Sequence, residues 1–326
     1  MDNKILVSIK CTVYNHEPYI RQCLEGLVMQ KTDFRFEAIV HDDASTDGSA
    51  AIIREYAEKY PDIIKPIYET ENQYSKRDGS LSRIMNAHMH GKYIAFCEGD
   101  DYWTDPLKLQ KQVGWLEEHD DYVMSHSNCL CFHQSTGKFT HDKIEKKKIE
   151  IGSELSCEDI IRFPRIVMTL TVVIRKSVYD EIAFSDPFIF GSGNFLLGDI
   201  PRWYSAARMG KIHFLPDITS VYRELNSSAS HIKGFKNRYK FSVSAQGLRA
   251  YLCRRDNLSA DLSALIERRY ANVLLHHLVL NPDYRPVVPL LPNTYRFELF
   301  LQRHKLLGIY LAIKDVFRKL KLSKPL

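Results

Sequence analysis

The sequence predicts an α/β protein whose sheet is mainly parallel and doubly wound, with helices on both faces. In the first half of the chain, short apolar runs alternate with segments whose apolar residues recur at helical spacing. This alternation is typical of parallel strands joined by crossover helices. The chain has 326 residues and 44% hydrophobic content, enough for one large domain with a sizeable core and an appendage.

Four short strands are expected in the first third of the chain, at residues 5–11, 36–40, 63–68 and 93–97. Helices are expected between them, at about residues 18–28, 49–60 and 81–90. Pro18 suits the first turn of a helix, and Pro61 ends the second helix because the residue before a proline disfavours helical backbone. Pro66 lacks the N–H of a ladder hydrogen bond, so its strand is expected to be irregular or at an edge of the sheet.

The middle of the chain is less regular. We expect a helix at about residues 105–120, a strand beginning at Tyr122 and an apolar, β-branched strand at residues 166–174. Residues 137–150 are polar and contain three consecutive lysines, which favours a solvated loop or a hairpin tip. A further helix is expected near Pro201.

The most informative feature is the acidic segment Glu98-Gly99-Asp100-Asp101, which directly follows the apolar strand at 93–97. Carboxylates that lie close together repel one another, and a divalent cation, which prefers oxygen ligands, would relieve that repulsion. Strand alternation places Glu98 and Asp100 on one side, with Gly99 leaving room for a ligand. The alternative is a surface turn rich in acids, since Gly-Asp-Asp is common in turns.

A second acidic segment, residues 41–48, follows the strand at 36–40. Because ligands of open α/β sheets bind outside the carboxyl ends of the strands, both acidic segments are expected to form one site. Asp43, just past the strand, is expected to contact a ligand. Asp47 is expected to cap the helix that begins near Ser49.

Through these motifs the chain resembles family 2 glycosyltransferases with the GT-A fold, of the bacterial type that builds surface polysaccharides. Residues 5–15 resemble the family's first strand and nucleotide-contact turn, and residues 42–47 resemble its acidic second turn. Residues 91–101 resemble the strand with the metal motif, usually Asp-any-Asp, with Glu98 in place of the first Asp. The resemblance covers roughly residues 4–230.

The resemblance implies an inverting transferase that uses Mn²⁺ or Mg²⁺. It would move a sugar from a nucleotide-diphosphate donor, with UDP-sugars favoured, to a hydroxyl of a glycan or lipid-linked acceptor. Asp100 would hold the metal, with Glu98 binding directly or through water and His231 as a further candidate. Asp199 takes the place of the catalytic base, although Gly198 replaces the acid that usually precedes it. One carboxylate is sufficient for an inverting transfer, and capping of the next helix is the alternative role of Asp199.

The nucleotide-sugar contacts that the resemblance implies are Thr12, Tyr14, Glu17, Asp43, Arg83, Asp101 and Trp103. Two of these assignments, and that of His231 to the metal, have open alternatives or rivals. Arg77 is a rival of Arg83 for the phosphate, and packing is the alternative role of Trp103. A lone histidine such as His231 is often a loop or core residue.

The chain is expected to divide into a transferase domain, residues 1–232, and a helical extension, residues 233–326. In the extension, helices are expected at 235–251 and 258–280, followed by a proline-rich break and a basic amphipathic segment at 296–322. Residues 301–326 contain seven Lys or Arg and one acid, a net charge of 7 − 1 = +6, in a chain of net charge +5. Such a segment suits peripheral contact with a membrane, and packing on protein is the alternative.

The seven cysteines are scattered. Cys11 and Cys97 lie in apolar strands and are expected as core thiols, whereas Cys129 and Cys131 lack the partners of a zinc site. No signal peptide or apolar run of about 18 residues is seen, so a cytoplasmic location is expected, with association with the inner face of the membrane left open. No nucleic-acid module is visible.

Other function classes fit less well. The turn after the first strand, residues 12–17, has no glycine, which disfavours a nucleotidyltransferase or a Rossmann dehydrogenase. A processive synthase would need membrane spans and a Gln-any-any-Arg-Trp motif, which we do not find. The remaining alternative is a non-catalytic module that binds sugar nucleotides or glycans on a decayed transferase scaffold.

Overall fold

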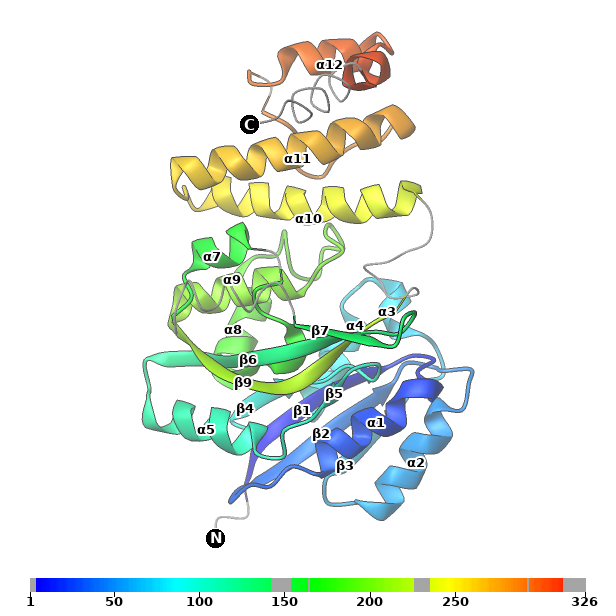
Figure 1. The fold of residues 1–326 in the computed structure, drawn as a ribbon, viewed down its shortest axis with the longest axis vertical. Helices are drawn as coiled ribbons and strands as arrows, with labels where there is room; N and C mark the ends of the chain where they lie inside the picture. Colours follow the sequence, from blue (N-terminus) through cyan, green and yellow to red (C-terminus); the bar gives the residue numbers. More distant parts are fainter. Residues whose placement is uncertain (1–3, 142–153, 164, 226–234, 292, 313–326) are drawn as a thin grey trace. The chain divides into compact units, whose positions relative to one another are not determined.

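The computed structural model describes residues 4–141, 154–163, 165–225, 235–291 and 293–312. These residues form two compact units (Figure 1). One contains the residues up to 193 together with 198–225. The other contains residues 194–197 together with those that follow 225.

The first unit is built on a nine-stranded sheet in the order β3-β2-β1-β4-β8-β6-β9-β5, with β7 paired to β6. The strands are β1 Ile5–Val13, β2 Arg35–Asp42, β3 Ile64–Tyr68, β4 Tyr93–Phe96, β5 Tyr102–Trp103, β6 Tyr122–His133, β7 Lys138–His141, β8 Val173–Arg175 and β9 Lys211–Glu224. Strands β1 to β4 run parallel, β8 is antiparallel to both of its neighbours, and β6 and β9 are parallel. Pro66 lies in β3, which is an edge strand as predicted.

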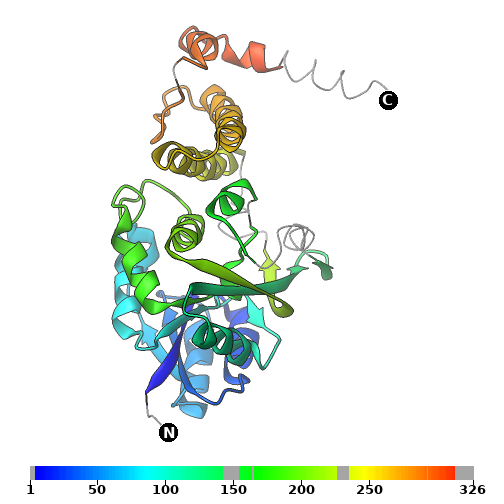
Figure 2. The same cartoon turned by 90° about the vertical axis from the view of Figure 1, so that its left-hand side faces the viewer.

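Helices cover both faces of this sheet (Figures 1 and 2). The helices of the unit are α1 Glu17–Val28, α2 Ser49–Lys59, α3 Gln73–Lys76, α4 Ser80–His88, α5 Lys108–Glu118, α7 Cys157–Arg162, α8 Lys176–Ser185 and α9 Asp199–Met209. Helices α1, α2 and α5 share one apolar core with the strands, while α4, α8 and α9 pack on the opposite face. The predicted α/β architecture is confirmed.

The core on the α1 side follows from the alternation of β1, whose residues Val7, Ile9 and Cys11 are fully buried. Cys11 and Cys97 are core thiols, as predicted. The sulfur of Cys23 on α1 lies 3.9 Å from that of Cys11 and 3.7 Å from that of Cys97. These thiols fill the interior as small apolar groups.

The expected strand at 166–174 is largely wrong, because only β8 forms at its end. The preceding residues are buried, but side chains satisfy their carbonyl groups instead of a neighbouring strand. Trp103 Nε1 donates to Leu170 O at 2.9 Å, and Gln112 Nε2 donates to Thr171 O at 2.9 Å. A short 3₁₀ turn, Thr169–Thr171, replaces the extended chain.

Strand β9, which the sequence analysis did not predict, is the longest strand described, at 14 residues. It contains Pro216, and its pairing with β6 shifts register beside that proline. Strands β6 and β7 form a hairpin, so the polar segment begins at a hairpin, one of the two expected possibilities. The rest of that segment lies outside the described residues.

The second unit contains α10 Phe235–Arg255, α11 Ala260–Leu280 and α12 Arg296–Arg303. The basic amphipathic segment expected from residue 296, which we interpreted as one helix, is divided, because α12 ends at Arg303 and a new helical segment begins at Leu307. Lys305 between them has φ of +59°, a left-handed conformation that a helix does not continue through. Residues 313–322 of that prediction lie outside the described residues.

Candidate active site

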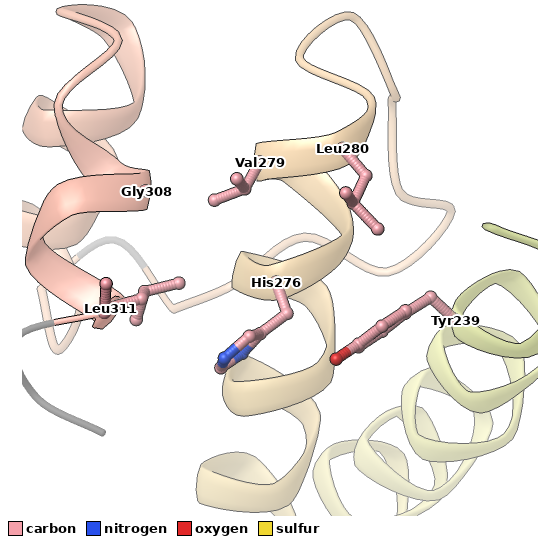
Figure 3. A pocket seen from close by; sticks show the side chains of 7 residues that line it. Tyr239, His276, Val279, Leu280, Gly308 and Leu311 are labelled. Carbon is pink, nitrogen blue, oxygen red and sulfur yellow. The ribbon is translucent and has the colours of Figure 1, made fainter. Parts of the chain in front are cut away.

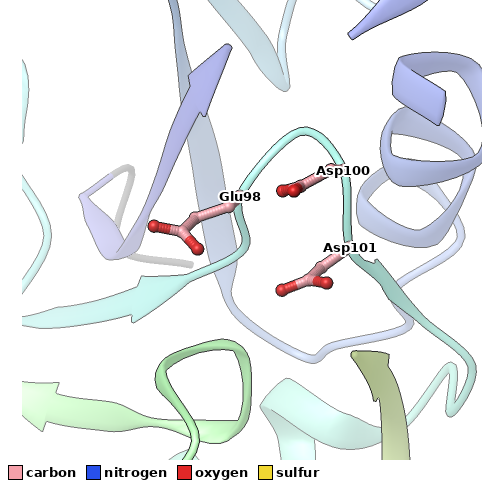
Figure 4. Close-up of side chains that lie close together, drawn as sticks. All are labelled: Glu98, Asp100 and Asp101. Carbon is pink, nitrogen blue, oxygen red and sulfur yellow. The ribbon is translucent and has the colours of Figure 1, made fainter. Parts of the chain in front are cut away.

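The acidic turn, residues 98–101, follows the central strand β4. One carboxylate oxygen from each of Glu98, Asp100 and Asp101 lies within 4.8 Å of the others (Figure 4). The turn is attached to β1, because the Gly99 N–H donates to Thr12 O at 2.9 Å. Since β1 pairs in parallel with both β2 and β4, the turns after β2 and β4 meet at one edge of the sheet, as predicted.

Gly99 has a packing role. A Cβ atom at this position would lie 2.8 Å from His16 Nδ1 and 2.9 Å from Val13 Cγ2. Only a residue without a side chain lets the turn lie this close to the loop between β1 and α1. The expectation that Gly99 leaves room for a ligand is therefore wrong, since protein atoms fill that space.

The crowding of acids raises the pKa of Glu98 and of Asp101. Glu98 reaches the surface, but the protein around it limits hydration and, with the charges of Asp100 and Asp199, raises the pKa of Glu98 to about 7. Burial, Asp100 and Glu98 raise the pKa of Asp101 well above its ordinary value. A nearby divalent cation would reverse this effect by favouring the ionised carboxylates.

The carboxylates of the acidic turn fit a divalent metal, because carboxylate oxygens are the ligands that Mg²⁺ and Mn²⁺ prefer. Glu98 and Asp100 remain the candidate ligands. Asp101 is only 3% exposed, and its Oδ1 accepts a hydrogen bond of 2.7 Å from the backbone N–H of Arg223. This burial argues against the expected contact of Asp101 with the nucleotide sugar, and places it as a third acid behind the other two. His231 lies outside the described residues.

The loops that follow β1 and β2 are joined by hydrogen bonds. The Glu17 N–H donates to Asp47 Oδ2 at 3.0 Å, and the Gly48 N–H donates to Glu17 Oε2 at 2.8 Å. Asp47 Oδ1 also accepts from the Ser49 N–H at 3.0 Å, so Asp47 holds the start of α2, as expected. Glu17, which we expected to contact the nucleotide sugar, takes part in these hydrogen bonds between the two loops, here called the brace.

Asp43 is almost fully buried and holds the start of α3. Its Oδ1 accepts from the Gln73 N–H at 2.6 Å, and its Oδ2 accepts from the Tyr74 N–H at 3.0 Å. The sequence did not indicate this anchoring role. A carboxylate oxygen can accept a second hydrogen bond, so the contact of Asp43 with a nucleotide base stays a prediction.

The other predicted donor contacts differ in exposure. Thr12 and Tyr14 lie at the end of β1, and Tyr14 is 47% exposed. Arg83 on α4 is exposed, and its Nη1 donates to Asp78 O at 2.6 Å. Arg77 ends α3 with φ of +55°. Phosphate contact by either arginine stays a prediction.

Trp103 lies in the core, so its predicted contact with the nucleotide sugar is wrong and the packing alternative is right. Its side chain is 2% exposed, and its Nε1 donates to Leu170 O. Lys108 Nζ lies 4.7 Å from the centre of the indole ring. The Trp103 backbone touches α1 at Gly26, where a Cβ would lie 2.8 Å from Trp103 O.

Asp199 is the first residue of α9, and its Oδ1 accepts the N–H of the next residue at 2.8 Å. The negative charge of Asp199 and the positive charge of Lys10 both act on Glu98, so all three share one region of the unit. Lys10 Nζ donates to Tyr179 OH at 3.0 Å, and the Arg202 guanidinium lies 5.8 Å from the Tyr179 ring centre. Burial alone would raise the pKa of Tyr179, but Lys10 and Arg202 lower it below its ordinary value.

Arg223, at the end of β9, contacts the acidic turn although no sequence pattern pointed to it. In addition to the backbone bond to Asp101, its Nε donates to Asp100 O at 2.8 Å. A single arginine in a polar segment is usually a surface residue. Only the pairing of β9 brings Arg223 to this turn.

Comparison with known proteins identifies the family. The model of the family "Glycosyl transferase family 2" matches residues 8–169. "Putative teichuronic acid biosynthesis glycosyltransferase TuaG" of Bacillus subtilis (strain 168) is 34% identical over 233 residues, which are 71% of this chain and 83% of that protein.

Two solved structures share the fold. S. aureus TarS 1-349 in complex with UDP-GlcNAc has a TM-score of 0.61 and 18% identity, over 97% of this chain and 92% of that one. The mannosyltransferase PcManGT from Pyrobaculum calidifontis, in complex with GDP-Man and Mn²⁺, has a TM-score of 0.55 and 17% identity, over 98% and 89%. The fold is GT-A, as expected, and the sequence likeness across most of both chains shows that the protein belongs to glycosyl transferase family 2.

Proposed function

We propose that the protein transfers a sugar, with inversion, from a nucleotide-diphosphate donor to a hydroxyl of a glycan or lipid-linked acceptor in surface polysaccharide biosynthesis. One observation carries this proposal. The carboxylates of the acidic turn gather within 4.8 Å at the carboxyl end of β4, and Asp199 is close enough for its charge to act on Glu98. The nucleotide sugars and the Mn²⁺ bound by TarS and PcManGT support the same assignment.

In this reaction Asp199 is the base. Its carboxylate would take the proton of the acceptor hydroxyl as that oxygen attacks the anomeric carbon. The new bond joins the acceptor oxygen to the anomeric carbon, while the bond from that carbon to the diphosphate breaks on the opposite face. The configuration of the sugar is therefore inverted.

Glu98 and Asp100 would hold Mn²⁺ or Mg²⁺. When bound there, the cation supplies positive charge that stabilises the diphosphate leaving group. Thr12, Tyr14 and Asp43 would contact the nucleoside, and Arg83 would reach the phosphates. Lys10 supplies positive charge that acts on Glu98 and limits the repulsion between the acidic turn and the donor. Arg202 donates to Gly198 O, next to Asp199.

The test is a donor screen followed by one variant. UDP-, GDP-, dTDP- and CMP-sugars are compared by thermal shift with Mn²⁺, with Mg²⁺ and with EDTA, since a ligand of the folded state raises its apparent stability. Asp199→Asn should then keep the shift but lower turnover by about a hundred- to ten-thousand-fold. Near-normal turnover would exclude Asp199 as base. Donor binding without turnover by the wild type, given acceptor, would favour the non-catalytic alternative.

We also propose that the second unit contacts the inner face of the membrane from the cytoplasm. Phe297 and Phe300 on α12 are 57% and 54% exposed, and Ile309 is 63% exposed. An apolar pocket of about 210 Å³ lies between α10, α11 and residues 308–312 (Figure 3). In the described part of the chain, no helix is long and apolar enough to cross a membrane.

This contact predicts binding to anionic vesicles, because the tail from residue 301 is strongly basic. In a sedimentation assay, the protein should bind vesicles that contain phosphatidylglycerol and release at high salt. The Phe297→Ser/Phe300→Ser/Ile309→Ser variant should bind less. Binding that is equal for the variant, or equal for neutral vesicles, would contradict this part of the proposal.

A further inference from the structure

We propose that Arg223 is the positioning residue of the acidic turn, and that it sets the affinity of this turn for its divalent cation without contacting the ion. This inference rests on the proposed function, because it concerns the same metal site. It adds a residue from β9, more than 120 positions away in sequence, to a site that the sequence locates only after β4.

Arg223 holds the turn at two points. Its backbone N–H donates to Asp101 Oδ1 at 2.7 Å, and its side-chain Nε donates to Asp100 O at 2.8 Å. The first contact fixes the carboxylate of the buried acid. The second fixes the peptide group next to it, and therefore the direction in which the Asp100 side chain leaves the backbone.

The guanidinium is itself held in place. Its Nη1 donates to Gln134 Oε1 at 2.9 Å, and its Nη2 donates to Gln22 Oε1 at 2.6 Å. Its carbon lies 4.9 Å from the ring centre of Tyr19 and 5.3 Å from that of Tyr102. The residue is only 6% exposed, so few alternative side-chain conformations are open to it.

The charge of Arg223 adds to this geometric role. All of its side-chain hydrogen bonds go to neutral oxygens, and in the described part of the chain no carboxylate forms an ion pair with it. Its positive charge is therefore not cancelled locally and attracts the carboxylates of the acidic turn. A buried cation behind three acids keeps them together before a metal arrives.

Arg175 on β8 is a matched control in the same unit. Like Arg223, it is largely buried and donates mainly to neutral oxygens, namely Tyr122 O, Leu116 O, His119 O and Tyr93 OH. None of these groups belongs to the acidic turn. Loss of either guanidinium should destabilise the fold, but only the loss of Arg223 should change the metal site.

The experiment measures Mn²⁺ affinity by electron paramagnetic resonance of the free ion, in the presence of UDP, for the wild type, Arg223→Gln, Arg223→Lys and Arg175→Gln. Removal of a group that orients metal ligands typically weakens binding by about 10- to 100-fold, and we expect that loss for Arg223→Gln. Arg223→Lys should recover part of the affinity because it keeps the charge. Arg175→Gln should bind as the wild type does, with a comparable loss of thermal stability.

If Arg223→Gln does not fold, the Gln22→Ala/Gln134→Ala variant tests the same role, because both glutamines are exposed and both hold the guanidinium of Arg223. Wild-type affinity in a folded Arg223→Gln, or in the double variant if that one is used, would overturn the inference. An equal loss in Arg175→Gln would do so too. A wild type that binds no Mn²⁺ with any of the nucleotides screened would instead contradict the proposed function itself.

Discussion

Glu17 and Asp47 join the starts of two neighbouring helices. The Glu17 N–H at the start of α1 donates to Asp47 Oδ2, and the Glu17 carboxylate accepts from the Gly48 N–H at the start of α2. A Cβ at Gly48 would lie 2.6 Å from the Glu17 carboxylate, so any other residue here would have to displace that carboxylate. The brace fixes the two loops that carry the predicted nucleoside contacts.

Asp47→Ala should lower the free energy of unfolding by about 1 kcal/mol, the typical loss when a side-chain acceptor at a helix start is removed. Burial would raise the pKa of Asp47, but its hydrogen bonds from Ser49 and Glu17 outweigh this and lower it. The stabilisation is therefore present above the ordinary Asp pKa and disappears as the pH falls through the lowered one. Urea unfolding at neutral and acidic pH measures this.

The exposed Asp62, for which no hydrogen bond is seen in the described part of the chain, is the control for that series. Asp62→Ala should leave the free energy of unfolding unchanged. A loss for Asp47→Ala that does not shrink toward acidic pH would show that the carboxylate is not the stabilising group.

Two glycines in helix interiors should respond to alanine in opposite directions. At Gly26 a Cβ would lie 2.8 Å from Trp103 O and 2.9 Å from Trp103 N, backbone atoms that cannot move aside. Gly26→Ala should therefore destabilise by about 1–3 kcal/mol. At Gly114 on α5 nothing lies within 4 Å, so Gly114→Ala should stabilise by about 0.5–1 kcal/mol. Chemical denaturation of both variants measures this, and a Gly26→Ala variant as stable as the wild type would contradict the packing of α1 on Trp103.

Lys108 should give the protein a pH-dependent stability. Burial lowers the pKa of this fully buried ammonium to about 7. Because the unfolded chain binds more protons than the folded one between pH 7 and the ordinary Lys pKa, this group makes stability rise with pH in that range. Relative to Lys108→Met, the wild type should gain at most about 1.4 kcal/mol per pH unit between pH 7 and 9.

The control is Lys111 on the same helix, which is partly exposed and whose pKa is raised by hydrogen bonds to Asp105 and Asp217. Relative to Lys111→Met, the wild type should gain no free energy of unfolding as the pH rises from 7 to 9. A wild type whose advantage over Lys108→Met stays constant across this range would mean that Lys108 remains charged in the folded protein.

The first half of the fold was predictable because its elements depend on local pattern. The apolar run of β1 and the helical spacing of apolar residues in α1 can be read directly from the sequence. So can Pro18, which marks the start of α1. Strand β9 was not predictable, because Pro216 interrupts its pattern and its stability comes from pairing with β6. The apolar run at 166–174 looked like a strand because the sequence does not show that Trp103 and Gln112 would satisfy its carbonyl groups.

The candidate site, like the fold, was predictable only where it depends on local sequence pattern. The acids that follow β2 and β4 were predictable, since parallel strands bring their carboxyl ends together. The roles of single residues depended on long-range contacts. Asp43 holds α3, Trp103 is buried beneath α1, and Arg223 reaches the acidic turn only because β9 pairs with β5 and β6.

We predict that the acidic turn holds the divalent cation through which the donor binds. Isothermal titration of UDP, or of the nucleotide that the donor screen selects, tests it directly in the wild type and in Asp100→Asn, with Mn²⁺ and with EDTA. We predict that the wild type binds with Mn²⁺ and loses this binding in EDTA, while Asp100→Asn binds weakly in both. Equal binding by the wild type in EDTA, or undiminished Mn²⁺-dependent binding by Asp100→Asn, would contradict the account.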